Sequence, residues 1–386
     1  MLLHIPAVQG GIGSKIADLA SEKLGTEVHI GHVDLGFLNR VIIDDLLIYD
    51  QHHKKMLSAS RIGAKVDLIP LLQSGAINIS SAQLFGLKAD LYKTTKDSKP
   101  NYQFVLDSLA SKDQSNKKPL HLSINSLVIR NGSIRYNQYD APQTPHRFNL
   151  HHLDITNIST HIVLDKLDDN SVIANLRSFS CKESAGLDVQ QLTFEVKANQ
   201  RQASLTAFNL QLPNSKVALE EIKAHYELKD KRLINNSLRF DIKGFNSTLQ
   251  PSDLSTFLPD LHLLRNPYRI VLSAQGTNHS VAIRQLTVSS PTESTLLKAR
   301  GWIKDYDTKP SWNITFAPLK IGHNTLINLA KVAKKPLPAP INNLGNIYYK
   351  GVISQQNNTY TARGDLNTNA GSARLAASMH GKNLRG

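Results

Sequence analysis

Residues 127–138 read LVIRNGSIRYNQ, two short apolar–polar alternations that meet at an Asn-Gly pair. A type I′ turn needs positive φ at both central residues, and Asn-Gly supplies it most readily. The stretch therefore predicts a β-hairpin in which Ile129 lies opposite Ile134 and Leu127 opposite Tyr136. These four side chains would share one face, because side chains alternate along a strand. An isolated hairpin cannot bury them, so the stretch predicts a larger sheet.

The same period of two runs along most of the chain, with Lys, Arg, Asp, Ser, Asn and Thr on the alternate positions. This pattern is typical of sheets that are apolar on one face only. The clearest examples are RIGAKVDL (61–68), VALEEIKAHYEL (217–228), SLRFDIKG (237–244), YRIVLSAQG (268–276), VAIRQLTV (281–288) and WNITF (312–316). The alternation slips by one residue at several points, as between Ile283 and Leu286, which predicts bulges.

Strands of this spacing would number roughly 20–25, and a sheet that large must curl or split. Helical spacing is confined to 12–25, 101–111, 252–261 and 324–335, followed by a stiff PLPAP connector at 336–340. So few helices cannot cover the sheet. Three architectures remain open: stacked sandwiches, a closed barrel, or a long curved sheet with an apolar concave face. The pattern alone predicts an all-β, mainly antiparallel protein with a few short helices, and it does not choose among the three.

Composition limits the function classes. The chain has 386 residues, of which 40% are apolar, and 45 Lys and Arg against 31 Asp and Glu give a net charge of +14. Such a basic surface suits nucleic acid, anionic lipid or an acidic protein. The aromatic residues are too few and scattered for base stacking, so we expect no nucleic-acid partner. The single cysteine, Cys181, excludes an internal disulfide framework.

No motif assembles catalytic chemistry. GGIGS (10–14) lacks the Lys-Ser/Thr ending of a phosphate-binding loop, and the pairs His52-His53 and His151-His152 lack partners at zinc-finger spacing. We therefore expect a protein that is not an enzyme and that needs no metal or other cofactor. The apolar start, MLLHIPAVQ (1–9), fits either the end of a membrane anchor or an ordinary N-terminal strand.

Three stretches together resemble the TamB and AsmA-like family, the inner-membrane subunit of the translocation and assembly module. The first is IPAVQGGIGSKIADLASEKLGTEVHIGHVDLGFLNRVIIDDLLIYD (5–50), with its apolar-Asp-Asp-Leu strand. The second is LSASRIGAKVDLIPLLQSGAINISSAQLFGLKADLY (57–92), and the third is the Asn-Gly stretch quoted first. The chain resembles the N-terminal periplasmic portion of this family.

The resemblance implies a periplasmic protein tethered to the inner membrane by an anchor outside the printed sequence. It implies the third architecture, a long, curved, mainly antiparallel, taco-like β-groove with an apolar concave face. It also implies an outer-membrane barrel partner and phospholipid acyl chains as ligands. On this basis we expect a post-anchor helix at 1–26, an AsmA-like groove unit at 27–115 with a helix near 101–111, and a continuing groove at 120–335. A further, truncated β segment would begin at 336–386.

The expected function is to shield acyl chains during phospholipid transport between the inner and outer membranes. The alternatives are a scaffold that binds outer-membrane β-strands by strand addition, and a β-sandwich without ligand. The alternation selects these candidate groove residues: Ile62, Val66, Leu127, Ile129, Ile134, Tyr136, Phe240, Ile242, Ile270 and Leu272.

Overall fold

The fold is that of an all-β protein, with 61% of the residues in strands and 11% in helices. The computed structural model describes residues 17–18, 20–36, 40–66, 77–110, 120–167, 170–229, 232–290, 292, 294–381 and 383–385. The prediction of a long, mainly antiparallel sheet with a few short helices is confirmed. The chain divides into two compact units, unit 1 (1–166 and 174–192) and unit 2 (167–173 and 193–386). The four sequence segments expected above stay a prediction.

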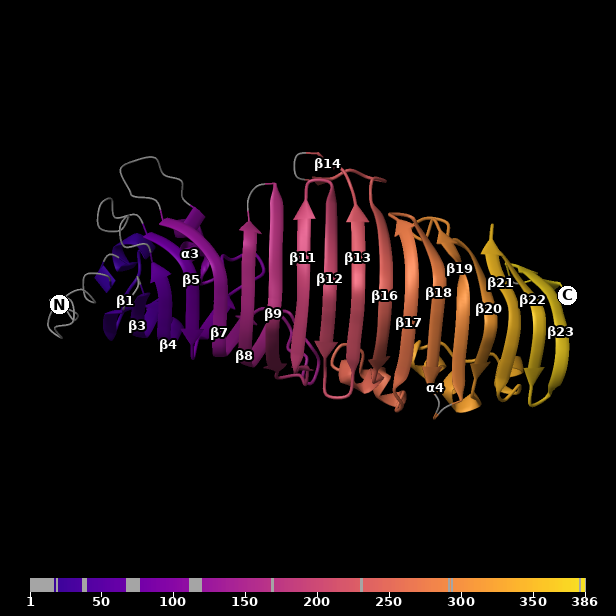
Figure 1. Cartoon of the computed structure of the whole chain (residues 1–386). Helices are drawn as coiled ribbons and strands as arrows, with labels where there is room; N and C mark the ends of the chain where they lie inside the picture. The colour runs from indigo at the N-terminus through magenta and orange to yellow at the C-terminus, as the bar shows by residue number, and fades with distance from the viewer. Residues whose placement is uncertain are drawn as a thin grey trace. The chain divides into compact units, whose positions relative to one another are not determined.

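Unit 1 contains the N-terminal strands, indigo to magenta in Figure 1. They are β1 (Val28–His29), β2 (His32–Gly36), β3 (Arg40–Tyr49), β4 (Lys55–Val66), β5 (Ile77–Phe85), β6 (Lys88–Lys93), β7 (Leu120–Gln138) and β8 (His152–Leu167), together with β10 (Asp188–Val189). The strands β1 and β2 pair with β3, which is followed across the sheet by β4, by the β5–β6 segment, by β7 and by β8. The units divide at the last residue of β8 and within β9 (Ser171–Glu183) and β11 (Gln191–Asn199).

The pairs that β7 forms with β5 and β6 are parallel, unlike the rest of unit 1. Parallel neighbours need a crossover connection. The chain between Lys93 and Leu120 provides it and contains helix α3 (Gln103–Ala110). The helix predicted at 101–111 is thereby confirmed.

The hairpin predicted at the Asn-Gly pair is wrong. Strand β7 runs straight through it, and of the two residues only Asn131 has positive φ, at 54°. The backbone on both sides stays extended because β7 lies between two neighbours. Ser133 N–H donates to Leu87 O at 2.7 Å, Gly86 N–H donates to Arg130 O at 3.0 Å, and the ladder to β8 continues past the pair. Tertiary pairing has overridden the local turn preference.

Four neighbouring strand segments of unit 1 each contain one residue with a left-handed backbone conformation, and these residues lie in a line across the sheet, which we call the kink line. Asp45, Gly86, Asn131 and Asn157 have φ between 53° and 60° and interrupt the ladders of β3, of the β5–β6 segment, of β7 and of β8. Such residues bend a strand and re-aim its side chains by one position. This kink line explains why Ile129 and Ile134 are five residues apart and yet both fit the apolar pattern.

Substituting Gly86 tests whether the kink line requires a left-handed residue at this position. Its φ is +60°, and a Cβ placed on it would lie 2.6 Å from Ser60 Oγ, which donates to Phe85 O at 2.8 Å. We expect Gly86→Ala to lower the free energy of unfolding by about 2–3 kcal/mol, the sum of left-handed strain and a lost hydrogen bond. Urea denaturation measures this loss.

Gly25 supplies the matched control for Gly86. Its φ is +66°, but nothing lies within 4 Å of its added Cβ. Gly25→Ala should therefore cost only about 1–2 kcal/mol, from left-handed strain alone. Equal losses in the two variants would show that the contact with Ser60 contributes nothing.

Unit 2 is an antiparallel sheet whose long strands pair in chain order. The strands are β12 (Gln202–Gln211), β13 (Lys216–His225), β16 (Arg239–Leu249), β17 (Tyr268–Thr277), β18 (Ser280–Ser290), β19 (Thr295–Lys304), β20 (Ser311–Ile321), β21 (Ile347–Gln356), β22 (Thr359–Thr368), β23 (Gly371–His380) and β24 (Asn383–Arg385). Each hydrogen bonds to the next. A small hairpin, β14 (Leu228–Lys229) and β15 (Arg232–Leu233), lies between β13 and β16 in the chain. No pairing among the described residues of unit 2 closes this sheet into a barrel.

Short helices connect some of the strands. They are η2 (Pro251–Leu254) and η3 (Pro259–Leu263) between β16 and β17, and α4 (His323–Val332) and α5 (Ala339–Asn342) between β20 and β21. The helix predicted at 324–335 corresponds to α4, and the one at 252–261 is two 3₁₀ turns. Of the helix predicted at 12–25, residues 17–18 and 20–24 are helical, and residues 12–16 and 19 lie outside the described residues.

Candidate functional site

The register of unit 2 places apolar residues from ten strands in one row. Each residue of this central row is directly opposite the next in a paired strand, so all share a face. The row consists of Leu205, Ile222, Ile242, Ala274, Ile283, Gly301, Ile314, Ile353, Ala362 and Ala377. A second row, two residues along each strand, runs through Ala203, Ala224, Phe240, Gly276, Val281, Ile303, Trp312, Gln355, Tyr360 and Met379. We call the face that carries them the apolar face.

Bulges extend the apolar face to the other half of the strands. Strand β17 alternates without interruption, so Ile270, Leu272 and Ala274 lie on the same side. Opposite them, the register shifts in β16 between Ile242 and Phe245, and in the β18–β19 ladder after Ile283. Each register shift keeps the next apolar residue of the strand on the apolar face. The bulge predicted between Ile283 and Leu286 is confirmed. The rows added on this side are Phe245, Leu272, Leu286, Ala299 and Phe316, and then Ile270, Val288, Leu297, Leu319 and Tyr349.

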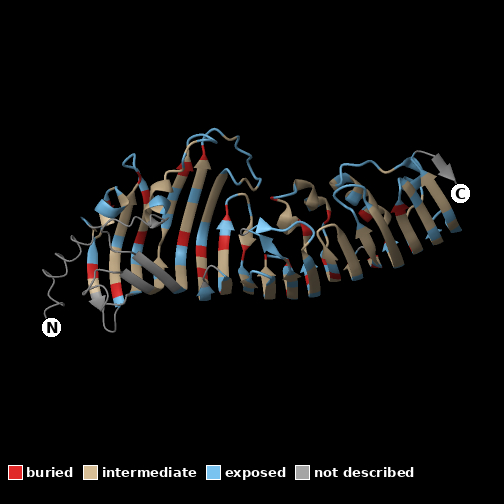
Figure 2. Cartoon of the chain, turned by 90° about the horizontal axis from the view of Figure 1, so that it is seen from above, coloured by how far each residue is buried: buried red, intermediate tan, exposed pale blue. Residues whose placement is uncertain are grey.

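Most side chains of the apolar face are only half-buried. In the central row Ala274 is buried, at 2% exposure, whereas Ile242, Ile283 and Ile314 are half-buried. Figure 2 shows the long strands of unit 2 mostly in the colour of intermediate burial. In a sandwich, a second sheet would pack on such a face and bury its aliphatic residues. Apart from the two-stranded hairpin β14–β15, the described part of unit 2 provides no second sheet.

The helical connectors adjoin one end of the apolar face. Tyr268 and Thr295 begin β17 and β19, while Ser290 and Ile321 end β18 and β20, and all four are buried. Asn328 of α4 donates to Leu263 O of η3 at 3.1 Å, which ties the two connectors together. The connectors therefore close the strand ends and leave the middle rows accessible.

Unit 1 also places apolar residues of neighbouring strands in rows, across fewer strands than unit 2. One row runs through Val33, Ile43, Ile62, Leu84, Ile129 and Thr160, and the next through Val41, Ala64, Ala82, Leu127 and Ile162. Beyond the kink line, the rows are Val28, Ile48, Leu57, Ala89, Ile134 and Ile155, and then Leu91, Tyr136 and Leu153. Burial raises the pKa of Tyr136, and Tyr102 adds to the shift. Tyr136 is therefore partly withdrawn from water.

The structure gathers the predicted groove residues into two sets. Ile62 and Ile129 share a row in unit 1, with Leu127 one row away and with Ile134 and Tyr136 beyond the kink. In unit 2, Ile242 and Phe240 occupy the first two rows, while Leu272 and Ile270 occupy the rows beyond the bulge. All nine are half-buried. The side chain of Val66 lies outside the described residues.

Sequence reasoning missed the part of the apolar face on β20 to β22. Trp312, Ile314, Ile353 and Tyr360 belong to the same two rows as Phe240 and Ile242. The available signal was the alternation in WNITF, which predicts a strand but not its partners. The rows become visible only when the register is known.

The remaining observations concern other classes of site. No helix in the described part of the chain is long and apolar enough to cross a bilayer. Among the described residues, no group of His, Cys, Asp and Glu is arranged to hold a metal ion. Comparison of the chain with protein-family models, curated proteins and solved structures finds no match. The resemblance to the TamB and AsmA-like family therefore stays a prediction.

Proposed function

We propose that this chain is a non-enzymatic carrier segment that shelters phospholipid acyl chains on its apolar face. The observation that carries the proposal is the central row of unit 2, in which ten paired strands present apolar residues that no second sheet buries. An apolar surface of this extent in water normally has a partner. Aliphatic and aromatic side chains without paired polar groups suit a hydrocarbon chain better than a polar ligand.

Dimensions and energetics support an acyl chain as that partner. Ten strands have nine gaps of about 4.8 Å, so the central row is about 43 Å long. The hydrocarbon core of a whole bilayer is about 30 Å thick, and one leaflet half that, so a fully extended acyl chain fits along the row. Exposing a 16-carbon chain to water costs roughly 12 kcal/mol at 0.8 kcal/mol per methylene. Contact with the row removes part of this cost while the headgroup stays in water.

The family resemblance supplies the proposed setting. A TamB-like or AsmA-like protein would work in the periplasm, tethered to the inner membrane, and would pass phospholipid toward the outer membrane with an outer-membrane barrel partner. The one-sided rows agree with a groove that conducts lipid.

Photo-crosslinking tests the proposal. We expect a photoreactive residue at Ile129 or Ile242 to form phospholipid adducts, detectable by mass spectrometry, in protein purified from cells. The same residue at Asn367, an exposed position of β22 on the opposite face, should form none. Adducts to polypeptide at Ile242 would favour the strand-binding scaffold instead. Equal lipid labelling at Asn367 and Ile242 would contradict the proposal.

A further inference from the structure

The polar face of unit 2 carries a concentrated positive charge. The five consecutive strands β17 to β21 contain no Asp or Glu. They contain seven cationic residues: Arg269, Arg284, Lys298, Arg300, Lys304, Lys320 and Lys350. Farther along the chain, Asp365 on β22 is the single acidic residue after Asp307, and Arg374 contacts it at 3.2 Å. The charge excess of the whole protein is thus concentrated in this region of unit 2.

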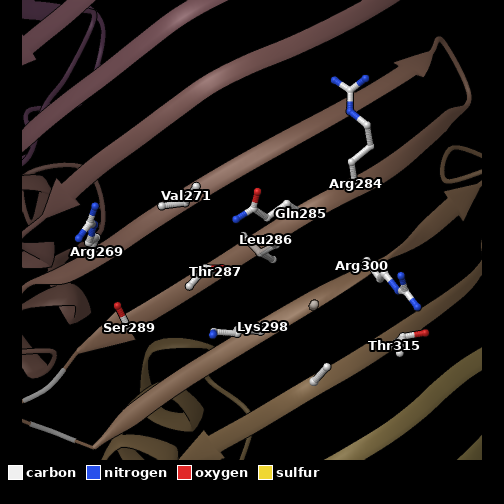
Figure 3. Close-up of a pocket in the computed structure, with 12 residues that line it drawn as sticks. Arg269, Val271, Arg284, Gln285, Leu286, Thr287, Ser289, Lys298, Arg300 and Thr315 are labelled. Atoms are coloured by element: carbon white, nitrogen blue, oxygen red, sulfur yellow. The ribbon is translucent and has the colours of Figure 1, made fainter.

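Four of the seven cations surround a hollow of about 560 Å³. Arg269 lies on β17, Arg284 on β18, and Lys298 and Arg300 on β19, and Figure 3 shows them on three consecutive strands. Val271 and Thr287 also line the hollow. Val271 is paired with Thr287, and Thr287 with Lys298, so these three residues form a row on the face opposite the apolar one.

Only one of the four cations is neutralised. Arg284 pairs with Asp241, donates to Ser273 Oγ at 3.0 Å and donates to Gln275 Oε1 at 3.2 Å. Arg269, Lys298 and Arg300 are exposed and have no side-chain hydrogen bond or ion pair among the described residues. Like charges on neighbouring strands repel and destabilise a sheet. A bound anion would relieve that repulsion.

We propose that this hollow, lined by Arg269, Lys298 and Arg300, binds a ligand that carries two or more phosphate groups. Guanidinium groups match phosphate oxygens two at a time, and lysine adds a point charge. Arg269 and Arg300 are two strands apart, about 9.6 Å across the sheet, and four residues apart along the strand direction, about 13 Å. Lys298 lies between them, about 6.6 Å from Arg300 along β19. This spread favours several linked phosphates over a single phosphate, whether they belong to a soluble polyphosphate or to a doubly phosphorylated lipid headgroup.

Calorimetry with inorganic tripolyphosphate at low ionic strength tests this site on the full chain. We expect saturable binding with one tripolyphosphate per chain. Lys298→Gln combined with Arg300→Gln should weaken the binding about 100-fold, which corresponds to a tenfold loss for each cation removed. The variant should fold normally, because both side chains are exposed and unpaired, and its melting temperature should not fall.

The charge-matched control is Lys216→Gln combined with Lys309→Gln, two exposed lysines of unit 2 outside the hollow. This control should bind tripolyphosphate within about twofold of the wild type, because distant surface charges are screened. Equal weakening in both double variants would overturn the proposal, since it would indicate general attraction to a basic protein. Absence of binding to the wild type would also overturn it.

Vesicles identify the source of the phosphates. If cardiolipin vesicles compete with tripolyphosphate for the wild type, the ligand of this site is a lipid headgroup. If tripolyphosphate binds and the vesicles do not compete, the ligand is a soluble polyphosphate. Binding to the vesicles alone would overturn the proposal in favour of a diffuse membrane contact. The lipid adduct expected at Ile242 lies on the other face and should persist in the Lys298 and Arg300 variant, so the two proposals can fail independently.

Discussion

Replacing Ile242 and Ile314 together by glutamate is expected to abolish retention of acyl chains by unit 2. Both residues belong to the central row, on β16 and β20, and both are half-buried. A carboxylate that loses water to a hydrocarbon chain costs several kcal/mol. Two such groups in one row should weaken lipid binding more than about 100-fold, since 1.4 kcal/mol is a factor of ten. Organic extraction of purified protein, with mass spectrometry of the extract, measures the lipid-to-protein ratio.

A control with the same charge change separates the apolar face from net charge. Asn367→Glu combined with Ala376→Glu places two carboxylates at exposed positions of β22 and β23, on the face opposite the apolar one and outside the basic hollow. This variant should retain lipid at the level of the wild type. The proposal fails if the Ile242 and Ile314 variant retains lipid equally well while its far-ultraviolet circular dichroism shows a folded sheet.

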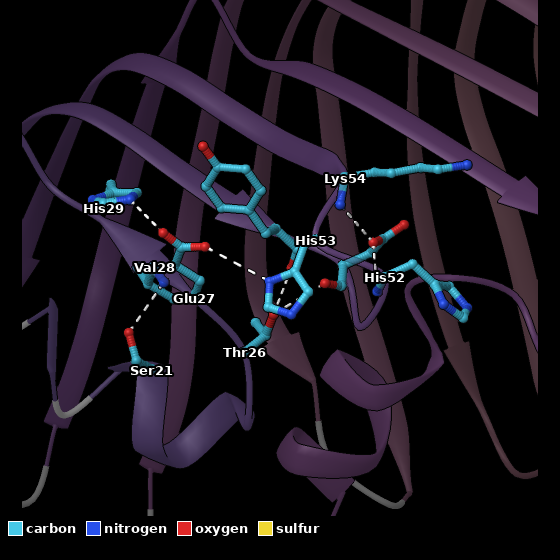
Figure 4. Close-up of polar contacts among 10 residues, drawn as sticks. Ser21, Thr26, Glu27, Val28, His29, His52, His53 and Lys54 are labelled. Carbon is cyan, nitrogen blue, oxygen red and sulfur yellow. Dashed lines mark hydrogen bonds and ion pairs between the residues drawn. The ribbon is translucent and has the colours of Figure 1, made fainter.

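Replacing Asp50 by alanine is expected to give the largest loss of stability, about 3–5 kcal/mol in the free energy of unfolding, because several buried donors lose their acceptor at roughly 1–3 kcal/mol each. Asp50 is 1% exposed and lies in the turn between β3 and β4. Its carboxylate accepts hydrogen bonds from His52 N–H at 2.8 Å, Lys54 N–H at 2.9 Å and Tyr92 O–H at 2.8 Å. The contacts of His52 and Lys54 are drawn in Figure 4. Removing the carboxylate leaves these donors without their acceptor.

Tyr92→Phe provides the graded comparison, because it removes one donor and keeps the carboxylate with its backbone hydrogen bonds. We expect a loss of about 1–2 kcal/mol. Urea denaturation at neutral pH measures both variants. Equal stability of Asp50→Ala and the wild type would show that this turn does not hold β3, β4 and β6 together.

The same carboxylate makes stability depend on pH. Burial alone would raise the pKa of Asp50, but the hydrogen bonds from Lys54, Tyr92, His52 and Asn101 together lower it below its ordinary value. A group whose pKa is lower in the folded state stabilises the protein above its unfolded pKa, about 3.9. That contribution should disappear as the pH falls through the lower, folded value. The Asp50→Ala variant should lack this part of the acid-induced loss.

The one-sided alternation was sufficient to predict the fold class and several residues of the apolar face. Alternation reports which residues share a face within one strand, and it correctly marked the slip after Ile283 as a bulge. It cannot report which strands are neighbours. Ile314 and Ile353 therefore entered the apolar face only through their pairing with β19 and with each other.

Local rules failed where neighbouring strands decide the backbone. Asn131-Gly132 has the residues of a tight turn, yet the β5–β6 segment and β8 hold it extended and confine the positive φ to Asn131. Asp50 gave no sequence signal, because its partners Tyr92 and Asn101 are 42 and 51 residues away. The basic hollow was equally hidden, since Arg269 and Lys298 meet only through the register of three strands.

The chain-order pairing of unit 2 has a consequence for how such a protein is made and how it changes. Each long strand from β13 to β23 pairs with the strands before and after it in the chain, apart from the small β14–β15 hairpin. Assembly can therefore proceed progressively as the polypeptide emerges, much as in repeat proteins whose units contact only their neighbours. Duplicating or deleting one hairpin would alter the reach by about 9.6 Å without rearranging any other ladder. Evolution can in this way match such a molecule to a fixed separation, one hairpin at a time.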